Sequence, residues 1–172
     1  MRSRAAAAAL VLLLGACATA PPQPLPDLSG VPASFEVTGR LALRQGQRSD
    51  IAKLRWTHRR ASDLWVISSP LGNEVARIES GPSGATLTQA GGGGVQADSF
   101  AELTDRALGI ELDPAMLARW LHGGAPSEAT GWKVTVEETQ KAGAVDIARR
   151  MSATRGEVVV RLVVDEYRVL GD

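Results

Sequence analysis

The sequence predicts an α+β domain in which one curved antiparallel sheet carries helices across one face. Three observations lead to this prediction. Short segments of alternating apolar and polar residues, typical of strands with one buried face, occur in both halves of the chain. Tight turns join the first five of these segments, which favours an antiparallel meander over βαβ units. Two helix-initiation signals lie together between the first group of strands and the last.

The first sixteen residues have the organisation of a secretory signal. Arg2 and Arg4 are basic, residues 5–14 form an unbroken apolar run, and Gly15-Ala16 precede Cys17. A membrane-spanning helix needs about 20 apolar residues, so this run is too short to cross a bilayer. It does fit a signal-peptide core of about 7–15 residues. We therefore expect residues 1–16 to direct export and to be removed.

Cys17 is the only cysteine of the chain. A single cysteine in an oxidising compartment has no disulfide partner, which disfavours a structural role for its thiol. The residues Leu14-Gly15-Ala16-Cys17 resemble the lipobox of bacterial lipoproteins, which implies diacylglycerol on the Cys17 sulfur and acylation of the new amino terminus. Under the enterobacterial sorting rule, Ala18 in place of Asp implies the outer membrane. The alternative is an ordinary secretory signal that ends by chance at a cysteine.

Residues 17–32 are predicted to be a tether between the acylated cysteine and the domain. Proline-rich segments form extended, semi-rigid spacers, and this stretch contains Pro21, Pro22, Pro24, Pro26 and Pro32. Residues 33–172 suffice for one domain with its own core. The chain has 19 basic and 19 acidic residues and therefore no net charge. Nucleic-acid-binding domains are strongly basic, so we expect no nucleic-acid partner.

The first group of strands is expected at residues 35–43, 51–57, 64–69, 75–79 and 85–89. In the first of them the alternation places Phe35, Val37, Leu41 and Leu43 on one face. Pro70-Leu71-Gly72-Asn73 reads as a tight turn, because proline presets φ at its second position and glycine or asparagine accepts a positive φ. An apolar residue at the tip of such a turn, here Leu71, is not expected to be buried by its own strands.

Two helices are expected in the middle of the chain. Ser99 and Glu102 form a capping box that begins the first helix, and Gly109 ends it. Asp113-Pro114 begins the second, because aspartate caps helices and proline is tolerated at their first position. The expected apolar faces are Phe100, Leu103 and Ala107 in the first helix and Met116, Leu117, Trp120 and Leu121 in the second. Strands resume at residues 132–138, 145–148 and 157–169.

The residues suited to catalysis form no recognisable site, and we predict neither enzymatic activity nor a metal or cofactor. His58 and His122 are far apart in sequence, whereas a zinc site needs three or four nitrogen, sulfur or oxygen ligands. Both histidines are expected to face solvent or to interact with a helix C-terminus. The Gly91–Gly94 run lacks the Gly-Lys-Ser/Thr of a phosphate-binding loop.

Several stretches, in the same order along nearly the whole domain, resemble the outer-membrane lipoprotein receptor family LolB. They are Phe35-Glu36-Val37-Thr38-Gly39-Arg40-Leu41-Ala42, Leu54-Arg55-Trp56, Ser69-Pro70-Leu71-Gly72, Trp120-Leu121-His122-Gly123, Gly131-Trp132-Lys133-Val134 and Val160-Arg161-Leu162-Val163-Val164-Asp165. The chain departs from the family pattern at two points. Ile147-Ala148 stands where the family often has Leu-Pro, and Tyr167 where it usually has Trp.

The resemblance implies an incomplete, half-open antiparallel β-barrel with helices packed as a lid over an apolar cavity. It also implies that the protein accepts acylated lipoproteins from the periplasmic carrier LolA and inserts them in the outer membrane. The loop of Pro70, Leu71 and Gly72 would enter the lipid, and we expect a monomer. Candidate cavity residues are the apolar ones of the inner sheet face and the helices: Leu41, Leu43, Leu54, Trp56, Ile67, Phe100, Leu103, Met116 and Trp120.

Two other classes of function stay open at this point. In one, the same residues simply form a closed core, and the protein is a structural or envelope-assembly lipoprotein of the outer membrane. In the other, it is a lipid-modifying enzyme, which would need a polar constellation that the sequence does not display.

Overall fold

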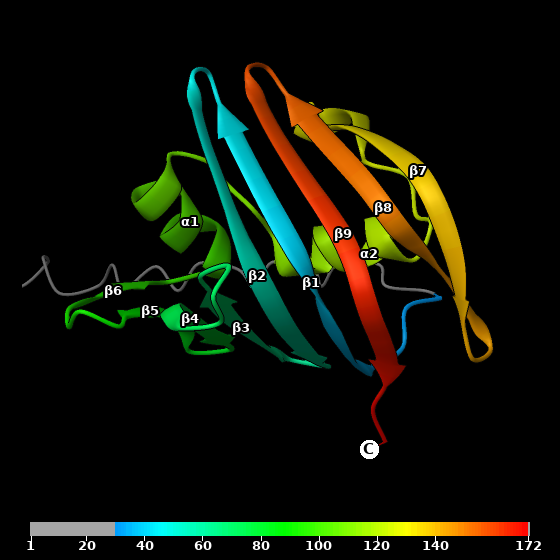
Figure 1. The fold of residues 1–172 in the computed structure, drawn as a ribbon, viewed down its shortest axis with the longest axis horizontal. Helices are drawn as coiled ribbons and strands as arrows, with labels where there is room; N and C mark the ends of the chain where they lie inside the picture. Colours follow the sequence, from blue (N-terminus) through cyan, green and yellow to red (C-terminus); the bar gives the residue numbers. More distant parts are fainter. Residues whose placement is uncertain (1–29, 172) are drawn as a thin grey trace, which may run out of the picture.

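A computed structural model describes residues 30–171, which form a single nine-stranded antiparallel sheet with two helices on one of its faces (Figure 1). The strands are β1 (Ser34–Gln45), β2 (Arg48–Arg59), β3 (Ser62–Ser68), β4 (Glu74–Gly81), β5 (Gly84–Gln89), β6 (Gly94–Ala97), β7 (Lys133–Ala142), β8 (Val145–Arg155) and β9 (Val158–Val169). The predicted α+β arrangement with an antiparallel meander is confirmed. Cys17 and Ala18 lie outside the described residues.

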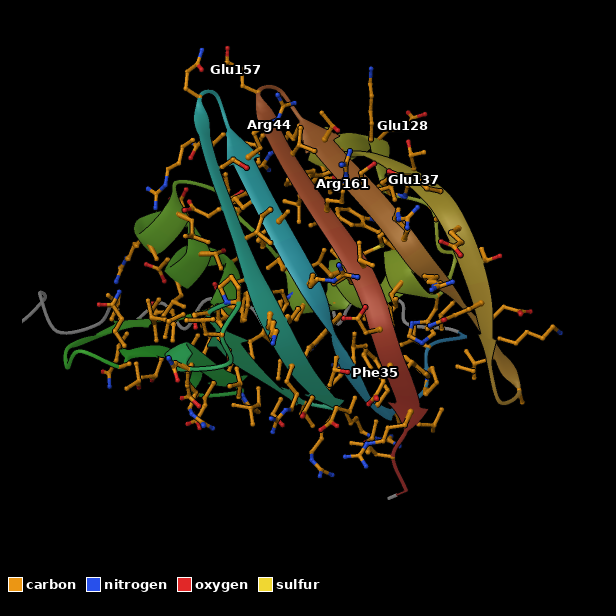
Figure 2. The ribbon with its side chains drawn as sticks, in the orientation of Figure 1. Phe35, Arg44, Glu128, Glu137, Glu157 and Arg161 are labelled. Carbon is orange, nitrogen blue, oxygen red and sulfur yellow. The ribbon has the colours of Figure 1, made fainter. Side chains whose placement is uncertain are left out.

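The sheet is open rather than closed into a barrel. Its strand order is β6-β5-β4-β3-β2-β1-β9-β8-β7, so the first and last strands of the domain, β1 and β9, pair with each other inside the sheet. β6 and β7 form the two edges and do not pair with each other. In Figure 2, Phe35 and Glu157 mark opposite ends of the long central strands.

β1 and β9 approach each other closely at Gly39. A β-bulge interrupts their pairing between Thr38 and Gly39, where Asp165 is the extra residue of β9. A Cβ atom on Gly39 would lie 2.1 Å from the carbonyl oxygen of Val163, so no larger residue fits without displacing the backbone. Glycine is therefore required here by close contact between strands.

The first helix, α1 (Phe100–Leu108), has the predicted cap with one change. The Ser99 hydroxyl accepts a hydrogen bond from the backbone N–H of Glu102 at 3.1 Å, and Gly109 ends the helix with a φ of +70°. The Glu102 carboxylate accepts from the N–H of Asp98 at 2.9 Å, one residue earlier than in a capping box. The expectation that Ala107 belongs to the buried stripe is wrong, because Thr104 is buried instead and Ala107 is exposed.

The second helix, α2 (Pro114–Leu121), begins where the sequence predicts. The Asp113 carboxylate accepts a hydrogen bond from the N–H of Ala115 at 2.8 Å, and Pro114 occupies the first turn. A 3-10 turn, η1 (Glu128–Thr130), precedes β7. No helix within residues 30–171 combines the length and apolarity needed to span a membrane.

Two strands differ from the expectation. β6 was not predicted, and β8 continues to Arg155 rather than ending near Ala148. β6 is four residues long and follows a run of glycines, which masks its alternation. The extension of β8 places Met151 and Ala153 on the inner face, opposite Leu162 and Val160 of β9.

Candidate functional site

An apolar space lies inside the domain between the sheet and α2. Its lining residues come from five strands and one helix: Leu41, Leu54, Trp56, Trp65, Leu117, Met151, Ala153, Val160 and Leu162. Its volume is about 10 Å³, which is room for about one water molecule. The interior is therefore filled almost completely by the protein's own side chains.

The nine residues proposed as cavity candidates lie in three positions. Leu41, Leu54 and Trp56 line the apolar space. Phe100, Leu103 and Trp120 are buried elsewhere in the core. The other three are half-buried and pack against that core: Leu43, Ile67 and Met116.

The six remaining lining residues were missing from the sequence-based set. Met151 and Ala153 lie in the unpredicted part of β8, and they pair with Leu162 and Val160. Trp65 faces inward because it pairs with Trp56 across β2 and β3, with ring centroids 5.5 Å apart. Alternation along residues 147–164 would have identified the inner face of the last two strands.

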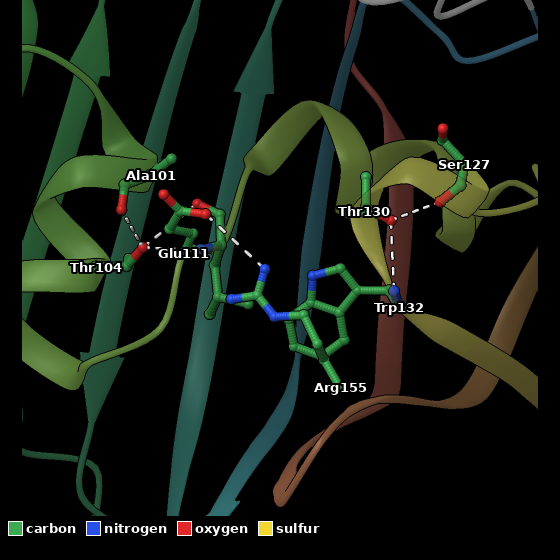
Figure 3. Close-up of polar contacts among 8 residues, drawn as sticks. Ala101, Thr104, Glu111, Ser127, Thr130, Trp132 and Arg155 are labelled. Carbon is green, nitrogen blue, oxygen red and sulfur yellow. Dashed lines mark hydrogen bonds and ion pairs between the residues drawn. The ribbon is translucent and has the colours of Figure 1, made fainter.

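A polar and aromatic cluster holds the connection between α1 and α2 against the rest of the domain (Figure 3). The Thr104 hydroxyl accepts a hydrogen bond from the N–H of Leu112 at 2.9 Å. The Arg155 guanidinium lies over the Trp132 ring, 4.9 Å from its centroid, and 3.9 Å from the Glu111 carboxylate. Arg155 therefore links the end of β8 to the start of β7 and to the connection between the helices.

The prediction that His58 faces solvent is wrong. His58 is 4% exposed, and its Nδ1 lies 2.9 Å from the Asp63 carboxylate oxygen, which also accepts from Trp56 Nε1 at 2.7 Å. The Phe35 ring stacks on the imidazole with centroids 4.9 Å apart. His58 follows Trp56 by two residues in β2, so both side chains point to the inner face, and Asp63 supplies the buried acceptor.

His122 lies at the C-terminal end of α2, as expected, but it is also half-buried. Its Nδ1 is 2.7 Å from the Ala118 carbonyl oxygen, and its Nε2 is 2.9 Å from the Tyr167 hydroxyl. Burial lowers the pKa of His122 and raises the pKa of Tyr167 to about 12. A neutral imidazole satisfies both contacts, since Nδ1–H donates to the carbonyl and Nε2 accepts from the phenol. The network joins α2 to β9, and both histidines contact Phe35.

The turn between β3 and β4 carries the most exposed large apolar side chain among the described residues. The N–H of Gly72 donates to the Ser69 carbonyl oxygen at 2.8 Å, the N–H of Ser69 donates to the Asn73 carbonyl oxygen at 2.8 Å, and Gly72 has a φ of +97°. This is a three-residue hairpin loop with glycine at its left-handed position. Leu71, at its tip, is 90% exposed.

Metal-binding geometry is not found in the part of the chain that the structure describes. No group of three or more His, Cys, Asp or Glu side chains within residues 30–171 is arranged to hold a metal ion. The proposed lipidation of Cys17 stays a prediction from the sequence.

Comparison with known proteins gives a consistent result. The family model described as "Outer membrane lipoprotein LolB" matches residues 33–167. A protein of Azoarcus sp. (strain BH72) named outer-membrane lipoprotein LolB is 30% identical, over 92% of this chain and 91% of its own. Proteins of the same name from Thiobacillus denitrificans and Neisseria meningitidis serogroup A are 32% and 30% identical, over 98% and 92% of this chain and 98% and 88% of theirs.

Proposed function

The chain belongs to the LolB family of outer-membrane lipoproteins, and on that premise we propose that it receives acylated lipoproteins from the periplasmic carrier LolA and inserts them in the outer membrane. It is a lipid-anchored protein of the outer membrane that acts in lipoprotein localisation rather than in catalysis. Cys17 would carry the anchor, and residues 17–32 would hold the domain off the bilayer.

The observation that carries this proposal is the apolar interior shared by the sheet and α2. Leu41, Leu54 and Leu162 of the sheet face Leu117 of the helix around one space. Burial of each methylene of an acyl chain is favourable by about 0.8 kcal/mol, so moving a whole chain from a membrane into water costs on the order of ten kcal/mol of free energy. An apolar interior removes that cost while a lipoprotein is between the carrier and the membrane. Transfer then needs no nucleotide if each site binds the chain more tightly than the one before.

An acyl chain cannot enter the interior as it stands, because about 10 Å³ is room for one water molecule. We infer that α1 and α2 move away from the sheet when cargo is accepted. The ion pair between Arg155 and Glu111 is long and partly exposed, at 3.9 Å, and pairs of this kind contribute little to stability. This ion pair therefore opposes the separation only weakly, and most of the cost lies in exposing the buried side chains of the connection, Ile110 and Leu112, whose apolar contacts an entering acyl chain would replace.

Filling the interior tests the proposal. Residues 30–172 contain the complete sheet, both helices and the core, so this domain can be studied without its anchor. Ala153→Leu adds bulk to the lining of the apolar space, whereas Ala148→Leu adds the same bulk to an equally buried site of β8 that does not line it. Overpacking costs about 1–3 kcal/mol at either site. Only Ala153→Leu should lower the affinity for a fluorescent acylated peptide and the uptake of lipoprotein from loaded LolA.

The small volume of the interior favours a second candidate instead, a structural or envelope-assembly outer-membrane lipoprotein with a filled core. In that case the folded domain would bind no acyl ligand, and Ala153→Leu and Ala148→Leu would differ only in stability. Binding of acylated peptide by the wild-type domain, with circular dichroism showing an intact fold, would exclude it.

A further inference from the structure

Exposed apolar side chains gather at one end of β2, β3 and β4. Among residues 30–171, six large hydrophobic side chains are exposed, and three of them belong to this region: Ile51 (63%), Leu71 (90%) and Val75 (43%). Lys53 of β2 pairs with Ser68, the last residue of β3. Continuing this antiparallel register by two residues places Ile51 beside Pro70, so the isoleucine adjoins the turn that carries Leu71.

The sheet face that carries Ile51 is basic around it. On the outer face, Ile51 of β2 pairs with Ala42 of β1, which in turn pairs with Arg161 of β9. Two residues further along the strands, Lys53 of β2 pairs with Arg40 of β1. Figure 2 shows Arg44 and Arg161 in the same half of the central strands. Four cations of this face form no ion pair within the described residues: Arg44, Lys53, Arg55 and Arg161. Asp165, the neighbouring carboxylate, is already bound by Arg40 at 3.1 Å.

We propose that Ile51 and the turn at residues 69–73, together with Lys53, Arg55 and their basic neighbours, form one docking surface for a bilayer rich in anionic, phosphate-bearing lipids. This proposal rests on the proposed function, because it identifies the membrane to which cargo is delivered. Leu71 enters the acyl region, Ile51 lies at its boundary, and the cations meet the headgroup phosphates.

Charge and shape together favour a lipid surface over an acidic protein. The whole chain has equal numbers of basic and acidic residues, so the unpaired cations are a local asymmetry rather than a general property. An acidic protein would complement those cations, but Leu71 projects from the tip of a three-residue turn and would also need an apolar pocket in that partner. A bilayer offers both partners at once: headgroup phosphates for the cations and, beneath them, an apolar interior for Leu71.

Binding to vesicles tests the surface without cargo or carrier. The domain of residues 30–172 is mixed with vesicles of phosphatidylcholine alone, or of phosphatidylcholine with phosphatidylglycerol, and the bound fraction is measured by co-sedimentation. We expect tighter binding to the anionic vesicles and a decrease as salt screens the charges. The double variant Lys53→Gln/Arg55→Gln should bind anionic vesicles about fivefold more weakly for each charge removed. Its binding to phosphatidylcholine alone should not change.

A matched control removes the same charge from the other end of β2. Arg59 and Arg60 are exposed cations, and Arg59→Gln/Arg60→Gln should bind anionic vesicles like the wild type. Ile51→Ser should weaken binding to both kinds of vesicle. Equal losses in the two double variants, no preference for anionic vesicles, or binding to an acidic protein in place of vesicles would each overturn the docking surface.

Uptake of lipoprotein from loaded LolA, measured with no vesicles present, separates this proposal from the proposed function. Uptake should be unchanged in Lys53→Gln/Arg55→Gln. If the wild-type domain fails to take up cargo but prefers anionic vesicles, the proposed function is wrong and the docking surface stands. Normal uptake without that preference refutes the docking surface alone.

Discussion

Replacing Leu71 with glutamate should separate acceptance of cargo from its delivery. The side chain is 90% exposed at the tip of a turn, so its replacement removes almost no packing. Substitutions at such surface positions change the free energy of unfolding by about 0.5 kcal/mol or less. Uptake of lipoprotein from LolA by Leu71→Glu should therefore match that of the wild type.

Delivery to membranes by Leu71→Glu should fail, and the free energy that is lost can be worked out from the exposure of the leucine side chain. Nearly the whole leucine side chain is available for burial in lipid, and such burial is worth about 1.5–3 kcal/mol. Since about 1.4 kcal/mol is a factor of ten, losing it makes insertion of the loop roughly ten-fold or more rarer. Glutamate also adds the cost of bringing a charge toward the apolar region. Leu71→Ile keeps the apolar area and should deliver almost normally.

The assay scores two transfers of a labelled lipoprotein separately, from LolA to the protein and from the protein to liposomes. Val169→Glu is the matched control, because Val169 is a half-exposed apolar residue at the end of β9, and β9 lies three strands away from β3 in the sheet. If Leu71→Glu delivers at the wild-type rate, or if Val169→Glu is equally impaired, the turn is not the insertion device.

Three further predictions concern the anchor and the buried polar groups. Mass spectrometry of the mature N-terminus should find acyl chains on Cys17, and fractionation should place the protein in the outer membrane; an unmodified cysteine would contradict the lipobox. Asp63→Ala should lower the free energy of unfolding in urea by about 2–4 kcal/mol, because it leaves an indole and an imidazole donor without their acceptor; a loss under 1 kcal/mol would show that water replaces the carboxylate. Since burial holds the pKa of His122 below its usual 6.5, the unfolded state takes up a proton first as pH falls, and stability should decrease from about pH 6.5 downward. His122→Gln should show a flatter dependence over that range, and an identical slope would assign the titration to other groups.

The strands and helices were predictable because they depend on local patterns. Alternation identified the inner face of β1, and Ser99 and Asp113 marked the starts of both helices. The exposure of Leu71 also followed from turn chemistry alone. These features need no knowledge of which strands are neighbours.

The interior and the buried histidines were not predictable in the same way, because they depend on register. The pairing of Met151 with Leu162 decides which residues line the apolar space, and the return of Asp63 beside His58 decides that a histidine can be buried. β6 was hidden for a different reason, since the glycines before it carry no side chains to alternate. The resemblance to a family indicated a cavity but could not indicate how much of it the side chains fill.

The unpaired edges of the sheet determine how the interior of the domain can change its width. In a closed barrel every strand is bonded on both sides, so the circumference is fixed and the interior can widen only if backbone hydrogen bonds break. Here β6 and β7 are separate edges, and the sheet can flatten or curl by small changes in twist along all nine strands while every ladder stays intact. Under the proposed function, the open sheet therefore allows the interior to widen for acyl chains of different number and length without the loss of a backbone hydrogen bond.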